Sequence, residues 1–148
     1  MFYHLRRYGS FKEAFARFYL GELLLALEYL HEFGIVHRSI RPESVLFNPA
    51  GHVRLVGFDY AKKVEDRTFT FCGAPDYLAP VRVANRSIHN FPDFLKGDFL
   101  CAIALYMCDA SQEQLTAKGY GKAVDFWAFG VLCFELIMGY PPFYDKSP

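Results

Sequence analysis

Residues 35–46 read Ile35-Val36-His37-Arg38-Ser39-Ile40-Arg41-Pro42-Glu43-Ser44-Val45-Leu46. This segment follows a long apolar helix pattern and runs directly into two short strand patterns. It carries a histidine, two arginines, a glutamate and two serines, which are the side chains that accept protons or bind charged groups. The rest of the chain is best understood by how it would place these polar groups.

A short helix is predicted from Met1 to Tyr8, and a longer one over residues 10–33. The segment Ser10-Phe11-Lys12-Glu13 has the form of a capping box at the start of the longer helix, and Gly34 is expected to end it. Apolar residues occupy both sides of this helix in its second half. We therefore expect it to be buried nearly all round.

A further long helix is predicted over residues 122–138, closed by Gly139. It is apolar on every face except at Asp125 and Glu135. Burying a carboxylate is costly unless it is paired or hydrogen-bonded. Each of these two side chains is therefore expected to have a polar partner.

Residues 45–47 and 52–56 are predicted to form two short strands. The four residues between them, Asn48-Pro49-Ala50-Gly51, have proline second and glycine fourth, which is typical of a turn. The sequence thus predicts a small β-hairpin immediately after the polar segment.

The chain has 148 residues and a formal net charge of +0, which gives no reason to expect nucleic acid or a membrane surface as a partner. Its longest apolar run, residues 99–108, is far shorter than the roughly 20 residues that span a bilayer. Four cysteines show no metal-binding spacing and are expected to be reduced thiols. Met1 is followed by no apolar signal segment, so the expected location is the cytoplasm, with the nucleus as a possible additional one.

Several segments resemble serine/threonine protein kinases of the cyclic-AMP-dependent branch. Residues 35–46 resemble the catalytic loop, residues 67–80 the activation segment and substrate-docking loop, and residues 118–128 and 139–143 later parts of the same domain. The resemblance implies a protein kinase-like fold of the α+β family. Within it, this chain would be a partial domain, the mainly α-helical C-lobe with a short β-hairpin, and the N-lobe would be absent.

The positions at which this sequence departs from the family are those that take part in catalysis. Ser39 stands at the position of the catalytic aspartate and Arg41 at that of a phosphate-contacting lysine. Ser44 and Gly57 stand at the two metal-ligand positions, so neither metal ligand is retained. Losing a general base typically costs ~10²–10⁴ in rate, and the metal ions neutralise charge in phosphoryl transfer.

The family uses ATP and magnesium, and the resemblance places the floor of the adenine site at residues 45–47, with Leu46 and Val56 as the candidate nucleotide contacts. A floor without the opposing lobe covers only one face of the base. We therefore expect weak or absent nucleotide binding by this chain.

The resemblance also implies a phosphorylation site at Thr70, with Arg38 and Lys62 to hold the phosphate. The alternative is an ordinary loop hydroxyl.

Glu43 and Glu135 match acidic residues that bind a basic substrate side chain, and either could instead pair with a nearby arginine. The implied partner is a basic peptide or a protein that resembles a regulatory subunit. The remaining docking-loop residues carried over are Phe71, Pro75 and Leu78, and the structural ones are His37, Phe58, Asp125 and Glu113.

Residues 81–112 have no counterpart in the family, and removing them places Glu113 directly after Ala79-Pro80, as the family pattern requires. The block begins with valine, whose codons start with GT, and ends with glutamine, one of whose codons is CAG. We expect it to be translated intron, with a genuine surface insertion as the alternative.

Three functions remain open at this point. The chain is a catalytically inactive kinase-like binding module, a truncated gene product without a function of its own, or part of an active ATP-dependent kinase to which an N-lobe is supplied.

Overall fold

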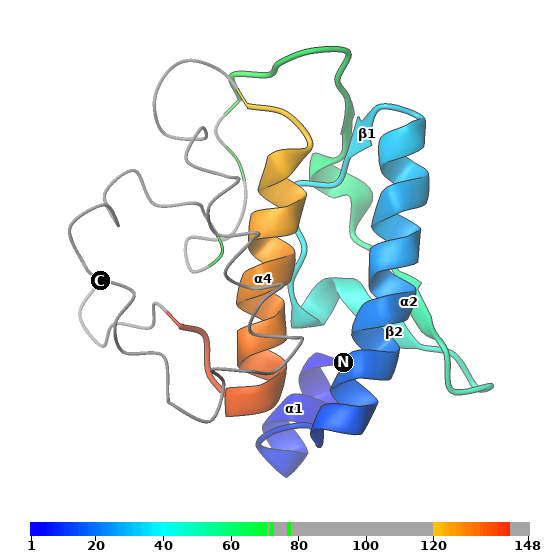
Figure 1. Cartoon of the computed structure of the whole chain (residues 1–148), viewed down its shortest axis with the longest axis vertical. Coiled ribbons are helices and arrows are strands. Elements are labelled where there is room, and N and C mark those ends of the chain that lie inside the picture. The colour runs from blue at the N-terminus through cyan, green and yellow to red at the C-terminus, as the bar shows by residue number, and fades with distance from the viewer. Residues whose placement is uncertain (71, 73–76, 78–119, 143–148) are drawn as a thin grey trace.

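The computed structural model describes residues 1–70, 72, 77 and 120–142. Two long helices, α2 (Glu13–Glu32) and α4 (Ala123–Met138), lie side by side and run in opposite directions, with a short helix, α1 (Phe2–Tyr8), at one end of the pair (Figure 1). The core between α2 and α4 is built from large apolar side chains that are at most 2% exposed: Leu20, Leu23, Leu27, Phe129, Leu132 and Leu136.

The α4 helix confirms the prediction for residues 122–138 to within one residue. Ten of its sixteen residues are buried, as expected for a helix that is apolar on nearly every face. It ends at Gly139, which adopts the left-handed conformation with φ +85° that glycine tolerates best.

The start of α2 differs from the prediction. The helix begins at Glu13 with Lys12 as its N-cap, and no side chain caps its first turn. The capping box at Ser10 does not form, and the N-cap lies two residues beyond it. The Phe11 amide donates instead to the Leu136 carbonyl near the end of α4, at 2.7 Å, which ties the segment before α2 to α4.

The expectation that α2 is buried nearly all round was wrong. Its inner face packs against α4 and β3, but five large apolar side chains on or next to its outer face are about half exposed or more: Phe15, Phe18, Leu25, Tyr29 and Phe33. The composition of a helix identifies apolar residues, but not which of its faces finds a partner.

The predicted hairpin is present. Strand β2 (Val45–Phe47) pairs antiparallel with β3 (Val53–Leu55), with Val45 opposite Leu55 and Phe47 opposite Val53. In the turn, the Gly51 amide donates to the Asn48 carbonyl at 3.0 Å, and Gly51 has φ +88°.

Short elements complete the described residues. Strand β1 (Ile35–Val36) pairs antiparallel with β4 (Lys62–Lys63), and two 3₁₀ turns, η1 (Pro42–Ser44) and η2 (Phe58–Tyr60), follow β1 and β3. None of the helices in these residues is both long and apolar enough to cross a membrane.

One carboxylate joins α2 to the hairpin. Glu22 accepts a hydrogen bond from the Val53 amide at 2.9 Å, and its other oxygen contacts His52 Nδ1. These contacts favour the charged form and hold the pKa of Glu22 below its usual value, the Val53 amide having the larger effect.

Replacing Glu22 with glutamine is expected to destabilise the chain at neutral pH and to have little effect in acid. Because the pKa of Glu22 is lowered by folding, its contribution is complete above the pKa of the unfolded chain and is lost as the pH falls through the folded value. Urea unfolding of both proteins at pH 7 and pH 3 measures the difference. Glu13→Gln is the matched control, since Glu13 pairs with Arg17 on the same helix. An equal loss at both pH values would contradict this assignment.

Candidate functional site

The polar segment is anchored by Asp125, which lies in the first turn of α4 and is fully buried. Its Oδ2 accepts the His37 amide at 2.8 Å, and its Oδ1 accepts the Arg38 amide at 2.7 Å. His31 of α2 places its Nε2 2.8 Å from Asp125 Oδ2. One carboxylate therefore ties α2, α4 and the start of the polar segment together.

This anchor holds a strained backbone. Arg38 has φ +65°, and among the described residues it is the one non-glycine residue with positive φ. Such a conformation costs on the order of 1–2 kcal/mol for an ordinary residue. The two hydrogen bonds to Asp125 lie on either side of this strained position and offset that cost.

His37 is a structural residue, packed in the core next to the polar segment. It is fully buried, its Nε2 donates to the Val56 carbonyl at 3.1 Å, and its ring packs edge-on against Phe58 with centroids 4.8 Å apart. Burial lowers the pKa of His37, although Asp125 acts in the opposite direction. The imidazole is thus neutral at physiological pH and links the polar segment to the end of the hairpin.

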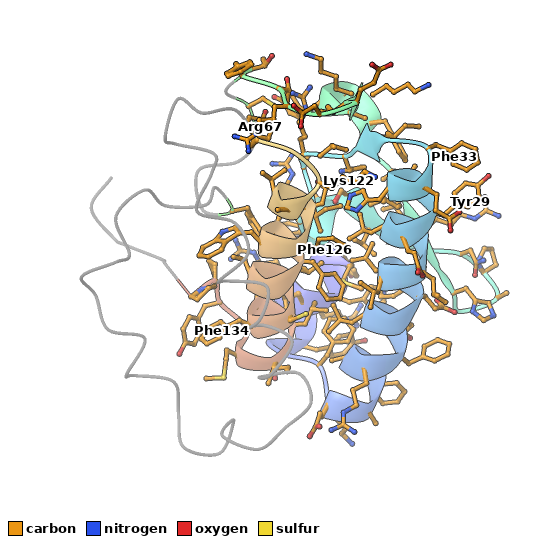
Figure 2. The ribbon with its side chains drawn as sticks, turned by 45° about the horizontal axis from the view of Figure 1, so that its top comes forward. Tyr29, Phe33, Arg67, Lys122, Phe126 and Phe134 are labelled. Atoms are coloured by element: carbon orange, nitrogen blue, oxygen red, sulfur yellow. The ribbon has the colours of Figure 1, made fainter. Side chains whose placement is uncertain are left out.

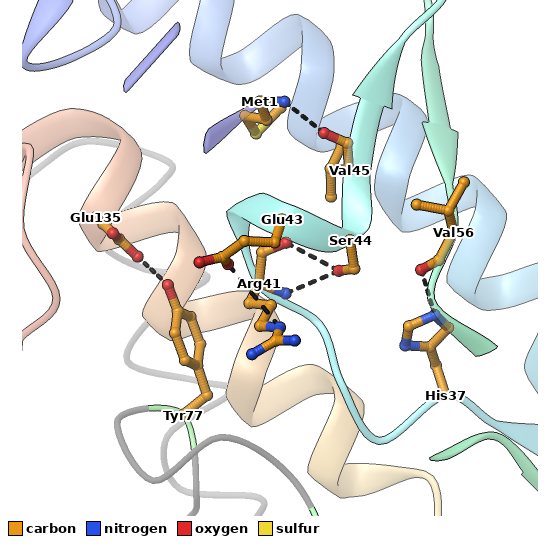
Figure 3. Close-up of polar contacts among 9 residues, drawn as sticks. All are labelled: Met1, His37, Arg41, Glu43, Ser44, Val45, Val56, Tyr77 and Glu135. Atoms are coloured by element: carbon orange, nitrogen blue, oxygen red, sulfur yellow. Dashed lines mark hydrogen bonds and ion pairs between the residues drawn. The ribbon is translucent and has the colours of Figure 1, made fainter. Parts of the chain in front are cut away.

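The Ser44 side chain closes the turn η1 by bonding to the backbone of Arg41 (Figure 3). Its Oγ donates to the Arg41 carbonyl at 2.8 Å and accepts the Arg41 amide at 3.0 Å, and its side chain is buried. The hydroxyl proton and one lone pair are therefore used within η1. Ser39, two residues before Arg41, is also buried, at 8% exposure.

Gly57 lies beside Ser44. A Cβ placed on Gly57 would be 3.6 Å from the Ser44 Cβ, so the two positions face each other across the end of the hairpin. Gly57 has φ +79° and presents no side chain here, while Asp59 is exposed in η2. Within the part of the chain that the structure describes, no three His, Cys, Asp or Glu side chains are grouped to hold a metal ion.

The candidate nucleotide contacts are on the hairpin. Leu46 in β2 is 49% exposed, and Val56, which follows β3, is half-buried. The Val56 amide donates to the Ser44 carbonyl at 2.8 Å. The structure thus places Val56 next to the turn that carries Ser44.

The two acidic docking candidates have different partners (Figure 3). Arg41 Nε lies 3.9 Å from Glu43 Oε2, and both side chains are about 40% exposed or more. The Tyr77 hydroxyl donates to Glu135 Oε2. The arginine pairing left open by the sequence is therefore present at Glu43, whereas Glu135 has a tyrosine partner that no sequence pattern indicated.

The phosphorylation candidate Thr70 is exposed, and its carbonyl accepts a hydrogen bond from the Tyr120 hydroxyl. The two basic residues expected to hold its phosphate, Arg38 and Lys62, donate hydrogen bonds to other residues instead. Arg38 donates to the Tyr60 carbonyl at 2.5 Å and to the Tyr120 hydroxyl at 3.2 Å, and Lys62 Nζ donates to Thr68 Oγ1 at 3.0 Å.

Tyr120 connects these groups and was missed by the sequence reasoning. It pairs with Thr68 through two backbone hydrogen bonds of 2.9 Å, and its hydroxyl receives Arg38. Burial is the main cause that raises the pKa of Tyr120, so its phenol stays protonated and able to donate. A single tyrosine next to a glycine has no periodic signal that could have revealed this role.

Four of the residues singled out from sequence, Phe71, Pro75, Leu78 and Glu113, lie outside the described residues, as does the block 81–112.

Comparison with known proteins gives consistent matches. A family model for the protein kinase domain matches residues 1–94. The cAMP-dependent protein kinase catalytic subunit of Dictyostelium discoideum is 42% identical over 147 residues, which cover 99% of this chain and 18% of that protein. Catalytic subunit 3 of Drosophila melanogaster is 39% identical over 148 residues, covering 100% of this chain and 20% of that protein.

The human catalytic subunit PRKX is 38% identical over 148 residues, covering 100% of this chain and 32% of that protein. The chain therefore spans about a fifth to a third of the length of these three relatives.

Proposed function

The chain belongs to the protein kinase domain family, and from that premise we propose that it is a kinase-like module of the cyclic-AMP-dependent branch that does not itself transfer phosphate. In this proposal the described helices and hairpin are the C-lobe portion of the domain. Relatives that match nearly the whole chain are cAMP-dependent protein kinase catalytic subunits by name, which supports the branch.

The observation that carries the proposal is the corner formed by Ser44 and Gly57. Ser44 uses its hydroxyl on the Arg41 backbone, and Gly57 beside it has no side chain. Magnesium requires oxygen ligands at near-octahedral geometry, usually with at least one carboxylate. These residues do not fit a magnesium ion, and we derive no catalytic step through one.

The residue needed for proton transfer is missing as well. Ser39 stands where the family's motif has a carboxylate base, and a hydroxyl cannot take a proton from a substrate alcohol at neutral pH. Without the base and the metal ligands, the segment keeps its position through Asp125 but offers little that stabilises phosphoryl transfer.

We further propose that the exposed carboxylate of Glu43 gives the module affinity for a basic peptide or for a partner that resembles a regulatory subunit. The Glu43 side chain is 46% exposed, and its 3.9 Å separation from Arg41 Nε is longer than a hydrogen bond, so its carboxylate can accept a second guanidinium from solvent.

The expected result is no phosphate transfer when the purified chain is incubated with labelled ATP, magnesium and an arginine-rich serine peptide. A catalytic subunit from the family, assayed in parallel, controls for the assay. A magnesium-dependent rise in melting temperature with ATP, or turnover that disappears in Ser39→Ala, would favour an active kinase instead. Peptide binding that is lost in Glu43→Gln, without turnover, would support the binding module.

A further inference from the structure

Three serine or threonine residues of this sequence follow an arginine by three positions, in the pairs Arg7–Ser10, Arg41–Ser44 and Arg67–Thr70. Kinases that carry acidic docking residues select substrates by such a pattern of charge, because a carboxylate of the enzyme pairs with an arginine shortly before the acceptor hydroxyl. A pattern this short occurs often by chance. The structure distinguishes the hydroxyls that such an enzyme can reach from those that it cannot.

Ser44 is inaccessible. It is 4% exposed, and its hydroxyl donates to the Arg41 carbonyl and accepts the Arg41 amide. A kinase would have to unfold η1, in which Pro42 is also buried, to reach this hydroxyl. Ser44 therefore has the sequence pattern without the accessibility, and it serves as an internal control for Ser10.

Ser10 has both the pattern and the accessibility. It lies between α1 and α2, and the capping box that would use its hydroxyl at the start of α2 does not form. Ser10 and the four residues before it, residues 6–9, are all exposed. The acceptor thus lies outside both helices, at the end of a continuous exposed segment.

The two arginines before this acceptor can serve as recognition elements. Arg6 lies over the Phe2 ring, 5.0 Å from its centroid. Arg7 lies over the Tyr8 ring at 5.6 Å, and its Nη1 donates to the Tyr3 hydroxyl at 3.1 Å. Within the part of the chain that the structure describes, neither arginine forms an ion pair. Contacts with aromatic rings leave a guanidinium most of its five donors, so both side chains can bind a carboxylate of another protein.

A kinase binds the residues around its acceptor in an extended form, so the last turn of α1 has to open. The Gly9 amide closes that turn by donating to the Leu5 carbonyl at 2.8 Å, and Leu5 is the one buried residue of this seven-residue helix. So short a helix is marginal by itself, and a segment with few buried contacts opens locally at low cost. The Phe11 amide, bonded to the Leu136 carbonyl, marks the far limit of the segment that has to open.

The other exposed acceptor, Thr70, lies at the opposite end of α4. Figure 2 shows Arg67 at the end of the molecule where α4 begins, and the Thr70 carbonyl accepts a hydrogen bond from the Tyr120 hydroxyl, just before that helix. Ser10 instead precedes the residue that bonds to Leu136, near the end of α4. Phosphorylation at Ser10 would therefore be a separate event from the one expected at Thr70.

We propose that Ser10 is a phosphorylation site for a protein kinase that selects an arginine three residues before the acceptor. In the reaction, the Ser10 oxygen forms a bond to the γ-phosphorus of ATP, while the bond from that phosphorus to the bridging oxygen breaks and ADP leaves. The hydroxyl proton passes to the carboxylate base of the kinase. The enzyme is a separate kinase, so the site is independent of any catalytic activity of the chain itself.

The test is to incubate the full chain with ATP, magnesium and a cAMP-dependent catalytic subunit, and to locate phosphate by mass spectrometry of the digested chain. We expect phosphate on Ser10 and none on the buried Ser44. Arg7→Ala should lower the initial rate at Ser10 by about tenfold or more, because it removes a charge-assisted hydrogen bond to the enzyme. Arg17→Ala removes an exposed arginine that does not precede Ser10, and as the matched control it should leave the rate unchanged.

A synthetic peptide of residues 4–14 separates the effect of the sequence pattern from that of the fold. If the peptide accepts phosphate and Ser10 of the full chain does not, the segment is closed in the folded protein and the proposal is overturned. It is overturned equally if neither accepts phosphate, or if Arg7→Ala leaves the rate at Ser10 unchanged. Phosphate on Ser44 at the same rate as on Ser10 would contradict the selection by exposure.

Discussion

Replacing Asp125 with alanine is expected to lower the free energy of unfolding by about 3–5 kcal/mol, the range seen when one partner of a buried charged network is removed. The variant leaves the His37 and Arg38 amides and His31 Nε2 without their acceptor. It also frees Arg38 from the bonds that hold it at φ +65°. Since whole domains are stable by only about 5–15 kcal/mol, this loss approaches complete unfolding.

Asp125→Asn keeps the shape and one carbonyl oxygen, so it should fold and show a smaller loss. Its NH₂ group would face a donor, which leaves at least one of the three hydrogen bonds unmade. The control is Asp59→Ala, which removes an exposed carboxylate and should change stability by no more than about 0.5 kcal/mol. Urea denaturation measures all three variants. Similar values for Asp125→Asn and Asp59→Ala would contradict the anchoring role.

The elements with strong local signals were predicted correctly. The stop signals at Gly34 and Gly139 mark the ends of α2 and α4, and the turn at residues 48–51 joins the two strands of the hairpin. These features depend on backbone conformations and periodicities that short stretches of sequence determine by themselves.

The features that the sequence did not reveal depend on distant contacts. Strands β1 and β4 have two residues each, too few for any periodicity, and they are paired only because the chain returns to that place. The hydroxyl of Tyr77 bonds a residue 58 positions away, and His31 reaches Asp125 across 94 positions. No spacing rule connects residues so far apart in the chain.

In the candidate site, too, one feature could be predicted from the sequence and another could not. The need for a partner at Asp125 followed from its place on an apolar helix, and the structure provides three donors to it. The hydrogen-bond partners of the Ser44 hydroxyl could not be predicted, because a serine hydroxyl can bond to solvent, to a ligand or to the backbone of its own turn at similar free-energy cost. It is the reciprocal bonding to Arg41 that removes it from the candidate ligands.

Replacing Gly139 with alanine is expected to lower the free energy of unfolding by about 2–5 kcal/mol through two effects. Gly139 has φ +85°, which costs an L-residue on the order of 1–2 kcal/mol. Its new Cβ would also stand 2.2 Å from the Gly9 carbonyl oxygen, a backbone atom that cannot rotate away. Relieving such an overlap requires a backbone shift that costs typically ~1–3 kcal/mol.

Gly51→Ala separates the two effects, because Gly51 has φ +88° but nothing within 4 Å of its Cβ position. We expect this control to lose only the conformational part, so that the difference between the two variants reports the contact with Gly9. That contact joins the end of α1 to the end of α4, next to the hydrogen bond from the Phe11 amide to the Leu136 carbonyl. Thermal or urea unfolding provides the measurement. Equal losses in both variants would mean that the ends of the two helices move apart easily, and that Phe11 alone holds them together.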